Sequence, residues 1–366
     1  MKSARSIKIF TGISVGVLVI SAISALAFGT VTASINKIDA FAGLDKRPEK
    51  KSSAVNYLLV GSDTREGLSE AELKALRVGS VATAAGKRSD TMLLVHISKA
   101  RDKAVIISIP RDSYALIPAH KNSAGKEISA AYSKINSSFN WGGAPLLIQT
   151  FEGMSNLKID HYIEINFVGF ARIVDSLGGI EVCTKKDIDD PKSHLVLPAG
   201  VHNLNGIEAL KYVRTREFDG LGDIGRMQRQ QAFMSSVVKK ATSLGVLLNP
   251  VTMTSFINSS LSAVTTDSGL NSSELIELAK QLKSLSASNV RTLTVPLSDL
   301  NYYANGVTAS VLWDPVLAPQ LWDRLREDRA VIDEVKPSPS PSATKAEKPK
   351  IIDKFKTRTA EDNICR

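Results

Sequence analysis

Cysteine and histidine are both scarce in this chain of 366 residues, which contains two cysteines and five histidines. The histidines are scattered, and no two of them have the spacing that places metal ligands on one face of a helix. No combination of cysteine and histidine resembles a zinc-binding pattern, which excludes a conventional zinc site. The sequence also contains no internal repeat.

Charge is absent from one long stretch near the N-terminus, residues 9–36, and three basic residues precede it. Such a stretch is long enough to cross a bilayer as a helix, and the basic flank predicts that residues 1–8 stay in the cytoplasm. We therefore expect a single-pass anchor in the cell membrane, with the main domain on the extracytoplasmic side. A cleaved signal peptide is the alternative, because Ala25-Leu26-Ala27 resembles a cleavage site, although the apolar run is long for a signal core.

The net charge of +9 favours an anionic partner, such as phosphate, nucleic acid or a membrane surface. Both interpretations of the N-terminus export the main domain, which argues against nucleic acid. In an exported protein two cysteines favour a disulfide, here between Cys183 and Cys365, and two unpaired thiols are the alternative.

Strand and helix signals alternate along the exported part, which predicts an α/β fold with layered α-β-α architecture around a central sheet. Three apolar runs, at residues 56–60, 91–97 and 104–109, are typical of buried strands. Shorter strands are expected at 162–165 and 180–183. Helices are expected at residues 146–154, 167–177, 205–213 and 226–247.

Composition divides the rest of the chain into four segments. We expect a polar, Lys-rich juxtamembrane spacer over residues 37–54 and the main domain over 55–329. A Pro/Ser-rich linker over 330–350 is expected to be disordered. A tail over 351–366 carries Cys365, and it folds back onto the domain if the disulfide forms.

Charged residues flank the three predicted strands. Asp63 follows the first strand, whereas Arg88 and Asp90 precede the second. Arg111 follows the third, directly after Pro110. Ligands of open α/β sheets bind beyond strand ends, so converging ends would let the carboxylates hold Mg²⁺ and the arginines hold phosphate. The alternative for each residue alone is a turn aspartate or a surface ion pair.

The densest charge cluster lies between residues 212 and 231 and leads into a predicted helix. It interleaves acids and glycines with four arginines; its charged members include Arg214, Arg216, Asp223, Arg226 and Arg229. Guanidinium groups bind phosphate through paired hydrogen bonds, and a helix start adds backbone N–H donors. The cluster predicts a site for a multiply charged phosphate group, and a salt-bridged surface is the alternative.

Two motif matches are not functional. Residues 220–225 satisfy G-x-G-x-x-G but follow no apolar strand and lack the later acidic residue, which argues against a dinucleotide fold. A G-x-S-x-G match at 12–16 lies in the predicted membrane segment. An apolar stripe at 167–177 is either the core-facing side of a helix or one wall of a cavity for an acyl or isoprenoid chain, and both interpretations stay open.

In this order and combination, the segments resemble the LytR-CpsA-Psr family of cell-wall polymer ligases over roughly residues 55–326. The matching segments are Leu58–Arg65, Arg88–Leu93, Ser108–Ser113, Asp160–Gly179 with Leu204–Gly206, and Tyr212–Gln230. The wide gap between Asp63 and Asp90 leaves the conformation of that loop open. A C-terminal cysteine that pairs with the domain resembles actinobacterial members.

The resemblance implies a phosphotransferase that moves a glycopolymer from a polyprenyl-pyrophosphate carrier to peptidoglycan, forming a phosphodiester. It implies the following roles: Mg²⁺ (or Mn²⁺) on Asp63 and Asp90, pyrophosphate on Arg111, Arg214 and Arg216, completion and orientation of that site by Asp223 and Arg226, and support from Arg88 and Arg229. The general base is Asp90 or another nearby carboxylate. A polyprenyl-pyrophosphate hydrolase and a non-catalytic wall-binding or regulatory protein are the alternatives.

Overall fold

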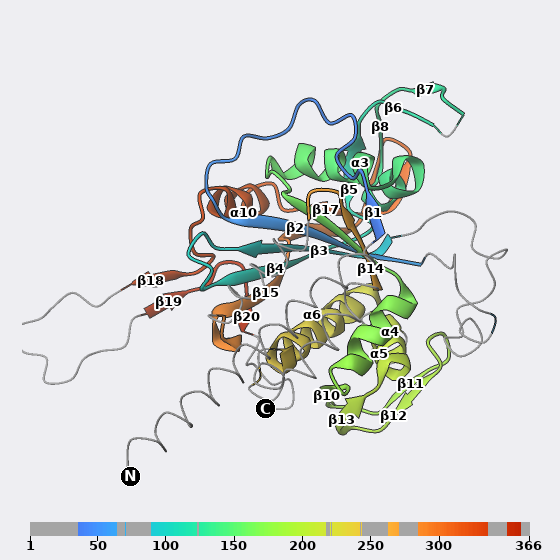
Figure 1. The fold of residues 1–366 in the computed structure, drawn as a ribbon, viewed down its shortest axis with the longest axis vertical. Coiled ribbons are helices and arrows are strands. Elements are labelled where there is room, and N and C mark those ends of the chain that lie inside the picture. Colours follow the sequence, from blue (N-terminus) through green and yellow to red (C-terminus); the bar gives the residue numbers. More distant parts are fainter. Residues whose placement is uncertain are drawn as a thin grey trace, which may run out of the picture.

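The computed structural model describes residues 36–63, 89–122, 124–216, 222–241, 263–270, 285–335 and 350–359, together with Glu70, Gly220 and Ser243. An eight-stranded mixed sheet lies between two layers of helices in this part of the chain (Figure 1). The predicted α-β-α layering around a central mixed sheet is therefore confirmed.

The central sheet has the strand order β1-β14-β9-β2-β3-β4-β15-β20. In that order the strands are Asn36–Ile38, Val264–Asp267, His161–Ile165, Val55–Ser62, Ser89–Ile97, Ala104–Ile109, Val290–Thr294 and Arg358–Thr359. β2, β3 and β4 form an antiparallel meander and correspond to the three predicted apolar strands. β9 and β15 add to it in parallel, beside β2 and β4 respectively.

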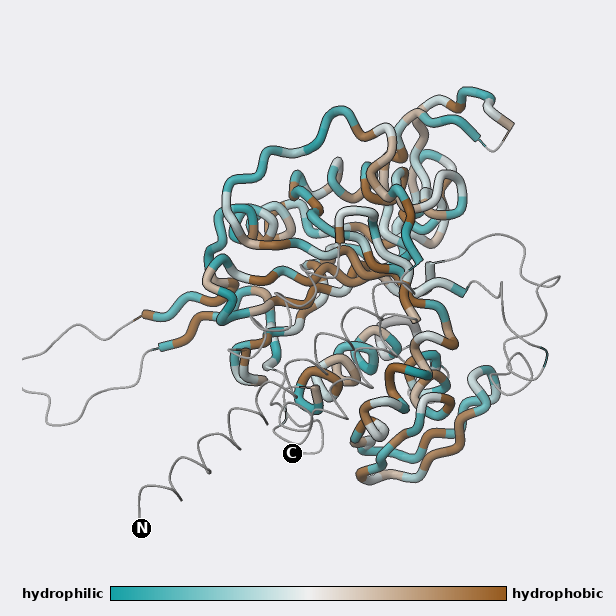
Figure 2. The backbone as a smooth tube through the Cα atoms, viewed as in Figure 1, coloured by the Kyte–Doolittle hydropathy of each residue, from teal (hydrophilic) through white to brown (hydrophobic). Residues whose placement is uncertain are grey.

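The helices divide between the two faces of the sheet. α3 (Ile135–Ser155) and α10 (Leu317–Arg326) cover one face, and α4 (Phe167–Ser176), α5 (Gly206–Arg214) and α6 (Gly222–Ala241) lie across the other (Figure 1). α3 bends at Gly143, whose φ of 64° is not helical. Figure 2 shows that the strands between the two layers are largely hydrophobic. The buried faces of the sheet thus supply the core that both helical layers cover.

Short antiparallel hairpins lie outside the central sheet. They are β5 (Tyr114–Ile117) with β8 (Ala131–Lys134), β6 (His120–Lys121) with β7 (Glu127–Ile128), β10 (Ile180–Thr184) with β13 (Gly200–Leu204), β11 (Ile188–Asp190) with β12 (Leu195–Leu197), β16 (Leu297–Ala304) with β17 (Val307–Trp313), and β18 (Asp333–Val335) with β19 (Lys350–Ile352). A 3₁₀ turn, η4 (Ala287–Asn289), precedes β15.

The predicted spacer over 37–54 is instead part of the folded domain. β1 pairs with β14 in the sheet, and Ala40 is fully buried in the main core. Arg47 donates to the carboxylate of Glu152 on α3, at 2.6 Å and 3.1 Å. These contacts join residues far apart in the sequence, so the polar composition of the segment gives no sign of them.

The predicted C-terminal boundary at 329 is also too early. Val331 and Ile332 are buried, and β18 pairs with β19 across the predicted linker. β20 then joins the edge of the sheet, and Phe355 packs into the main core. Residues 350–359 therefore fold back onto the domain, as expected for the tail.

Several predictions fall outside the described residues. They concern residues 1–35 of the cytoplasmic segment and anchor, most of the 64–88 loop, and Cys365. From Asn36 onward, the described residues include no helix long and apolar enough to cross a membrane. Cys183, on β10, carries no free thiol, and its pairing with Cys365 stays a prediction.

Candidate functional site

The ends of four strands converge at one edge of the sheet. The register pairs Gly61 on β2 with both Thr91 on β3 and Ile165 on β9, and it pairs Met92 on β3 with Ile109 on β4. The C-terminal ends of β2, β4 and β9 and the start of β3 therefore lie together. The backbone thus meets the condition under which the charged strand ends could form one site.

A β-bulge brings two of the predicted metal ligands close together in the backbone. Gly61 pairs with Thr91 but Ser62 pairs with Ser89, so Asp90 is the additional residue of β3. Bulges bend a strand and often lie beside active sites, where they redirect a side chain. The half-buried Asp63 follows Ser62 directly. The side chain of Asp90 and all of Arg88 lie outside the described part of the chain.

A tight turn projects Arg111 from the end of β4. Pro110 has no N–H group and ends the strand, and its carbonyl accepts from the N–H and the hydroxyl of Ser113 at 3.0 Å and 2.7 Å. The carbonyl of Arg111 accepts from the N–H of Asn136 at the start of α3, at 3.1 Å. Both ends of this turn are therefore held in place.

A buried threonine separates Arg214 and Arg216 and orients the loop that carries them. Thr215 is fully buried, and its hydroxyl contacts that of Ser193 at 3.0 Å. The carboxylate of Asp190, also buried, accepts from the N–H of Arg216 at 2.5 Å. Asp190 is thus a positioning residue, and no sequence motif singles it out.

Two adjacent glutamines fasten α6 against the sheet. The side-chain amide of Gln230 donates to the hydroxyl of Thr91 and to the carbonyl of Val213, each at 3.1 Å. That of Gln231 donates to the hydroxyls of Ser108 and Thr294, at 3.2 Å and 2.6 Å. These bonds fix the first half of α6, including Arg226, below β3 and β4.

Arg229 supports the loop that carries Arg214 and Arg216. It is buried, and its guanidinium donates to the carbonyl of Thr215 at 2.5 Å. Burial raises the pKa of the nearby Tyr212 phenol, and the positive charge of Arg229 partly opposes this increase. Tyr212 is therefore neutral near pH 7 and adds no negative charge.

Close backbone contacts hold α4 in place. Its first turn is capped by Asn166, whose side chain accepts from the N–H of Gly169 at 2.8 Å. A Cβ at Gly169 would lie 2.1 Å from the carbonyl oxygen of Ala263, and one at Gly206 would lie 2.3 Å from that of Ala171. Only glycine permits these approaches, which fix the helix and its two phenylalanines.

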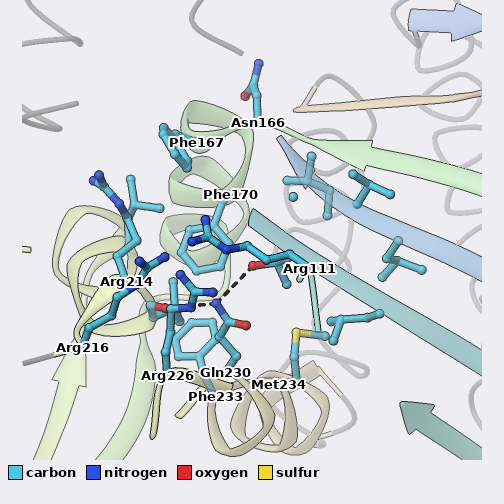
Figure 3. A pocket seen from close by; sticks show the side chains of 18 of the residues that line it. Arg111, Asn166, Phe167, Phe170, Arg214, Arg216, Arg226, Gln230, Phe233 and Met234 are labelled. Atoms are coloured by element: carbon cyan, nitrogen blue, oxygen red, sulfur yellow. Dashed lines mark hydrogen bonds between the residues drawn. The ribbon is translucent and has the colours of Figure 1, made fainter. Parts of the chain in front are cut away.

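These elements enclose a cavity of about 440 Å³ between the sheet and α4, α5 and α6 (Figure 3). Its cationic lining residues are Arg111, Lys192, Arg214, Arg216 and Arg226. Its apolar lining residues are Leu59, Val60, Leu93, Ile165, Phe167, Phe170, Leu210, Val213, Phe233 and Met234. No aspartate or glutamate is among the described lining residues.

The cations and the apolar groups occupy different parts of the cavity. In Figure 3 the guanidinium groups of Arg111, Arg216 and Arg226 reach toward one another from three different elements. The guanidinium carbon of Arg214 lies 5.1 Å from the centre of the Phe167 ring, a cation–π contact. Phe233 and Met234 from α6 form an apolar wall below Phe170. The cavity suits a ligand with an anionic head and an apolar chain.

The apolar stripe over residues 167–177, on α4, forms a cavity wall in its first turn and part of the core farther along. Phe167 and Phe170, in its first turn, line the cavity. Val174 and Leu177, one or two turns later, are buried in the core that also contains Tyr212 and Phe233. Helical spacing alone does not reveal where along a stripe the core gives way to a cavity.

Four of the predicted arginines line the cavity, namely Arg111, Arg214, Arg216 and Arg226. The structure adds Lys192, Asn166 and Gln230, to which the sequence analysis assigned no role. Asp223 is in the first turn of α6, but its side chain lies outside the described part. The described residues contain no group of three or more potential metal ligands, and the metal site stays a prediction.

The sequence matches the LytR_cpsA_psr family over residues 25–322. The chain belongs to this family. It is 35% identical over 275 residues to the probable cell wall biosynthesis protein LcpB of Corynebacterium glutamicum, a match that covers 75% of this chain and 62% of LcpB. It is 36% identical over 203 residues to the polyisoprenyl-teichoic acid–peptidoglycan teichoic acid transferase TagT of Bacillus subtilis, covering 54% of this chain and 55% of TagT. The chain thus spans less than two thirds of the length of these relatives.

Solved structures show the same fold. A LytR-Csp2A-Psr enzyme from Actinomyces oris superposes with a TM-score of 0.58 at 22% identity, covering 80% of this chain and 95% of that one. TagT bound to LIIa-WTA gives a TM-score of 0.55 at 24% identity, with 79% and 98% covered. At these identities the likeness establishes the fold alone.

Proposed function

We propose that this protein is a membrane-anchored phosphotransferase that moves a glycopolymer from a polyprenyl-pyrophosphate carrier to peptidoglycan. The observation that carries the proposal is the two-part cavity, with its cationic and apolar linings. A polyprenyl pyrophosphate has the matching chemistry, because two negatively charged phosphates are joined to a long hydrocarbon chain. The named activity of TagT, a polyisoprenyl-teichoic acid–peptidoglycan teichoic acid transferase, supports it.

The cationic part of the cavity would bind the pyrophosphate. Guanidinium groups bind phosphate oxygens in pairs, and a partly buried cluster of like charges is stabilised by an anion between them. Arg111, Arg216 and Arg226 converge, so they are the first contacts, and Arg214 binds between the head and Phe167. Arg229, behind Thr215, supports the loop, and Arg88 and Asp223 complete the site in this proposal.

The reaction exchanges one phosphorus–oxygen bond for another. A hydroxyl oxygen of the acceptor attacks the phosphorus that carries the glycopolymer, while the bond from that phosphorus to the polyprenyl phosphate breaks. The hydroxyl proton passes to a carboxylate, for which Asp90 is the proposed base, and polyprenyl monophosphate departs. The arginines stabilise charge on the non-bridging oxygens and on the leaving group without a covalent enzyme intermediate.

The edge of the sheet fits a magnesium ion. Asp63 and Asp90 carry hard oxygen ligands and are close together in the backbone at the bulge, near Gly61 and Thr91, which line the cavity. Mg²⁺ prefers one or two carboxylates together with substrate phosphates and water. When bound there, it would neutralise charge on the pyrophosphate.

Three further features belong to this proposal. The uncharged stretch that precedes β1 forms a single membrane anchor, and the folded domain lies on the extracytoplasmic side. Cys183 forms a disulfide with Cys365, which would fasten the tail beyond β20 to β10. The absence of a free thiol at Cys183, in a chain with one other cysteine, supports this pairing.

The direct test is transfer of a labelled glycopolymer. The full-length protein in detergent is mixed with a polyprenyl-pyrophosphate-linked, radiolabelled glycopolymer and purified peptidoglycan, and the label bound to washed peptidoglycan is counted. We expect Mg²⁺-dependent attachment that Arg216→Ala lowers by well over tenfold. The matched control is Arg329→Ala, since Arg329 is an exposed arginine that pairs with Glu327.

The outcomes separate the three functions. Label on peptidoglycan supports the phosphotransferase. Label released as free phosphorylated glycan, with none on peptidoglycan, supports the hydrolase instead. Tight binding of the carrier with neither product would indicate a non-catalytic wall-binding protein.

A further inference from the structure

An aromatic cluster lies outside the cavity, on the opposite side of the sheet. The rings of Tyr114 and Tyr132 stack in parallel, with centroids 4.9 Å apart and 3° between their planes. The ring of Tyr302 meets Tyr114 edge-on at 5.1 Å. Three of the seven tyrosines of the chain thus form one group, here called the tyrosine platform. Tyr114 and Tyr132 lie on the two strands of one hairpin, β5 and β8, and Tyr302 lies on β16 of a second hairpin.

The platform is partly exposed: Tyr132 is open to solvent, whereas Tyr114 and Tyr302 are half-buried. Ala115 and Ile117 point into the molecule and are buried, so Tyr114 and Leu116 occupy the outer face of β5. Tyr132 is 45% exposed and pairs with Leu116, which is 48% exposed. The hydroxyl of Tyr114 accepts from Asn305 in the β16–β17 turn. The three rings are therefore held in one arrangement, with Tyr132 as its most exposed member.

This surface has the chemistry that recognises sugars. The electron-rich face of an aromatic ring attracts the polarised C–H groups on the flat side of a pyranose, and phenolic hydroxyls bond to sugar hydroxyls. Rings that are already ordered lose little conformational freedom when a ligand binds. Stacked tyrosines on a water-facing surface thus fit a glycan better than an apolar ligand.

Ion pairs connect the platform to the cavity. Lys134 pairs with Tyr114 across the hairpin, and its ammonium lies 3.3 Å from the carboxylate of Asp112. The same carboxylate lies 3.5 Å from the guanidinium of Arg111, which lines the cavity. Tyr114 follows Arg111 by three positions, so their Cα atoms are at most about 11 Å apart. A glycan on the platform would therefore extend to the phosphate site.

The geometry of the reaction selects which glycan this is. In phosphoryl transfer the attacking and leaving oxygens lie roughly in line on opposite sides of the phosphorus. The leaving polyprenyl phosphate would occupy the apolar cavity between the sheet and α4, α5 and α6. Figure 1 shows β5, β8 and β17 on the other side of the sheet, beside α3. The attacking hydroxyl would approach from that side.

We propose, resting on the phosphotransferase function, that the tyrosine platform binds the glycan strand of the peptidoglycan acceptor and directs its hydroxyl toward the phosphate held by Arg111. Tyr114, Tyr132 and Tyr302 are positioning residues in this assignment. They contact the acceptor sugars beyond the reacting one.

The test compares Tyr132→Ala with Tyr303→Ala in the full-length protein. Tyr303 is also an exposed tyrosine on β16, at 59%, but it neighbours Tyr302 and so points to the other side of the strand. We expect Tyr132→Ala to raise the KM for soluble peptidoglycan glycan strands about tenfold, with kcat and the KM for the polyprenyl-pyrophosphate donor unchanged. Tyr132→Phe keeps the ring and should retain most of the acceptor affinity, and Tyr303→Ala should behave as wild type.

Calorimetric binding of the same glycan strands, without donor, separates this proposal from the phosphotransferase function. Weaker binding by Tyr132→Ala than by Tyr303→Ala supports the platform, even for a protein that performs no transfer. Equal binding, or equal acceptor KM in an active protein, overturns the platform and leaves the phosphotransferase function intact. A rise in the donor KM in place of the acceptor KM assigns the surface to the donor glycan and also overturns the proposal.

Discussion

At one end of the central sheet five cationic side chains gather around one cavity, whereas at the other end single basic groups pair one by one with carboxylates that also hold the backbone. At this distal end Arg47 meets Glu152 at 2.6 Å and Lys50 meets Asp160 at 2.5 Å. His96 lies 3.3 Å from Asp328, and His161 lies 3.3 Å from Asp267. The two ends are joined by the same strands, because β2 and β3 run from one to the other.

The difference shows what each end is built for. At the distal end the carboxylates also accept backbone N–H groups, since Asp160 binds Asn56 and Glu152 binds Ile159, at 2.9 Å and 2.8 Å. These bonds join segments distant in sequence and stabilise the fold. The cavity instead gathers five cationic side chains from separate segments around one space, an arrangement that serves ligand binding and is retained for function. Substitutions at the two ends should therefore separate stability from activity.

The largest effect is expected from Glu152→Ala at the distal end. Glu152 is only 3% exposed, and its loss leaves Arg47 and the N–H of Ile159 without their acceptor. Breaking a buried pair in this way costs about 3–5 kcal/mol of unfolding free energy. Urea denaturation measures the loss, and transfer activity per folded molecule should equal that of wild type. A large fall in activity per folded molecule would contradict the claim that the distal end serves stability and not activity.

Arg216→Ala at the cavity should have the opposite profile. Removing a charge-assisted phosphate contact costs about 2–4 kcal/mol of transition-state stabilisation, so kcat/KM should fall well over tenfold. The free energy of unfolding should stay within about 0.5 kcal/mol of wild type, as for other changes outside the core. The same expectation holds for Arg214→Ala. Wild-type turnover in both variants would contradict the role of the arginine cluster.

A smaller effect is expected from Asp63→Asn at the bulge. The substitution keeps the size of the side chain but removes half of the ligand charge at the proposed metal site. Half-maximal activity should then need about tenfold more Mg²⁺, equivalent to about 1.4 kcal/mol. The expectation for Asp90→Asn is the same. A magnesium titration that overlays wild type for both variants would mean that these aspartates only cap turns.

The smallest effect is expected from Asp267→Asn at the distal end, and it depends on pH. Burial would raise the pKa of Asp267, but hydrogen bonds from His161 and from the N–H of Tyr162 outweigh it, so the pKa is lowered. A lowered pKa stabilises the folded state above the ordinary aspartate value of about 3.9, and that contribution disappears as pH falls through the folded-state pKa. The Tm advantage of wild type over the variant should shrink from about pH 5 to below about pH 3. An advantage that is constant or grows with acid would contradict the sign of the shift.

Much of the frame was predictable because buried strands have a nearly continuous apolar sequence. β2, β3 and β4 correspond to the three predicted runs. Because they pair as an antiparallel meander, the end of β2, the start of β3 and the end of β4 lie at the same edge of the sheet. The arginine cluster was predictable because four arginines lie close together in the sequence, between residues 214 and 229, beside a predicted helix start. Arg111 was predictable because proline ends the strand before it.

The rest depends on contacts that local sequence does not encode. Arg47 and Glu152 lie 105 positions apart, so nothing in residues 37–54 signals a folded segment. Lys192 reaches the cavity because Asp190 accepts from its N–H and from that of Arg216. The tyrosine platform joins two hairpins that are far apart in the sequence, β5 with β8 and β16 with β17, so no local pattern reveals it.

The most direct test of the central claim is a crystal structure of the protein with a polyprenyl pyrophosphate. We expect the two phosphates between Arg111, Arg216 and Arg226, and the hydrocarbon chain along Phe170 and Phe233. Mg²⁺ should lie between the phosphates and Asp63. A lipid bound outside this cavity, or one whose phosphates lie away from these arginines, would contradict the account.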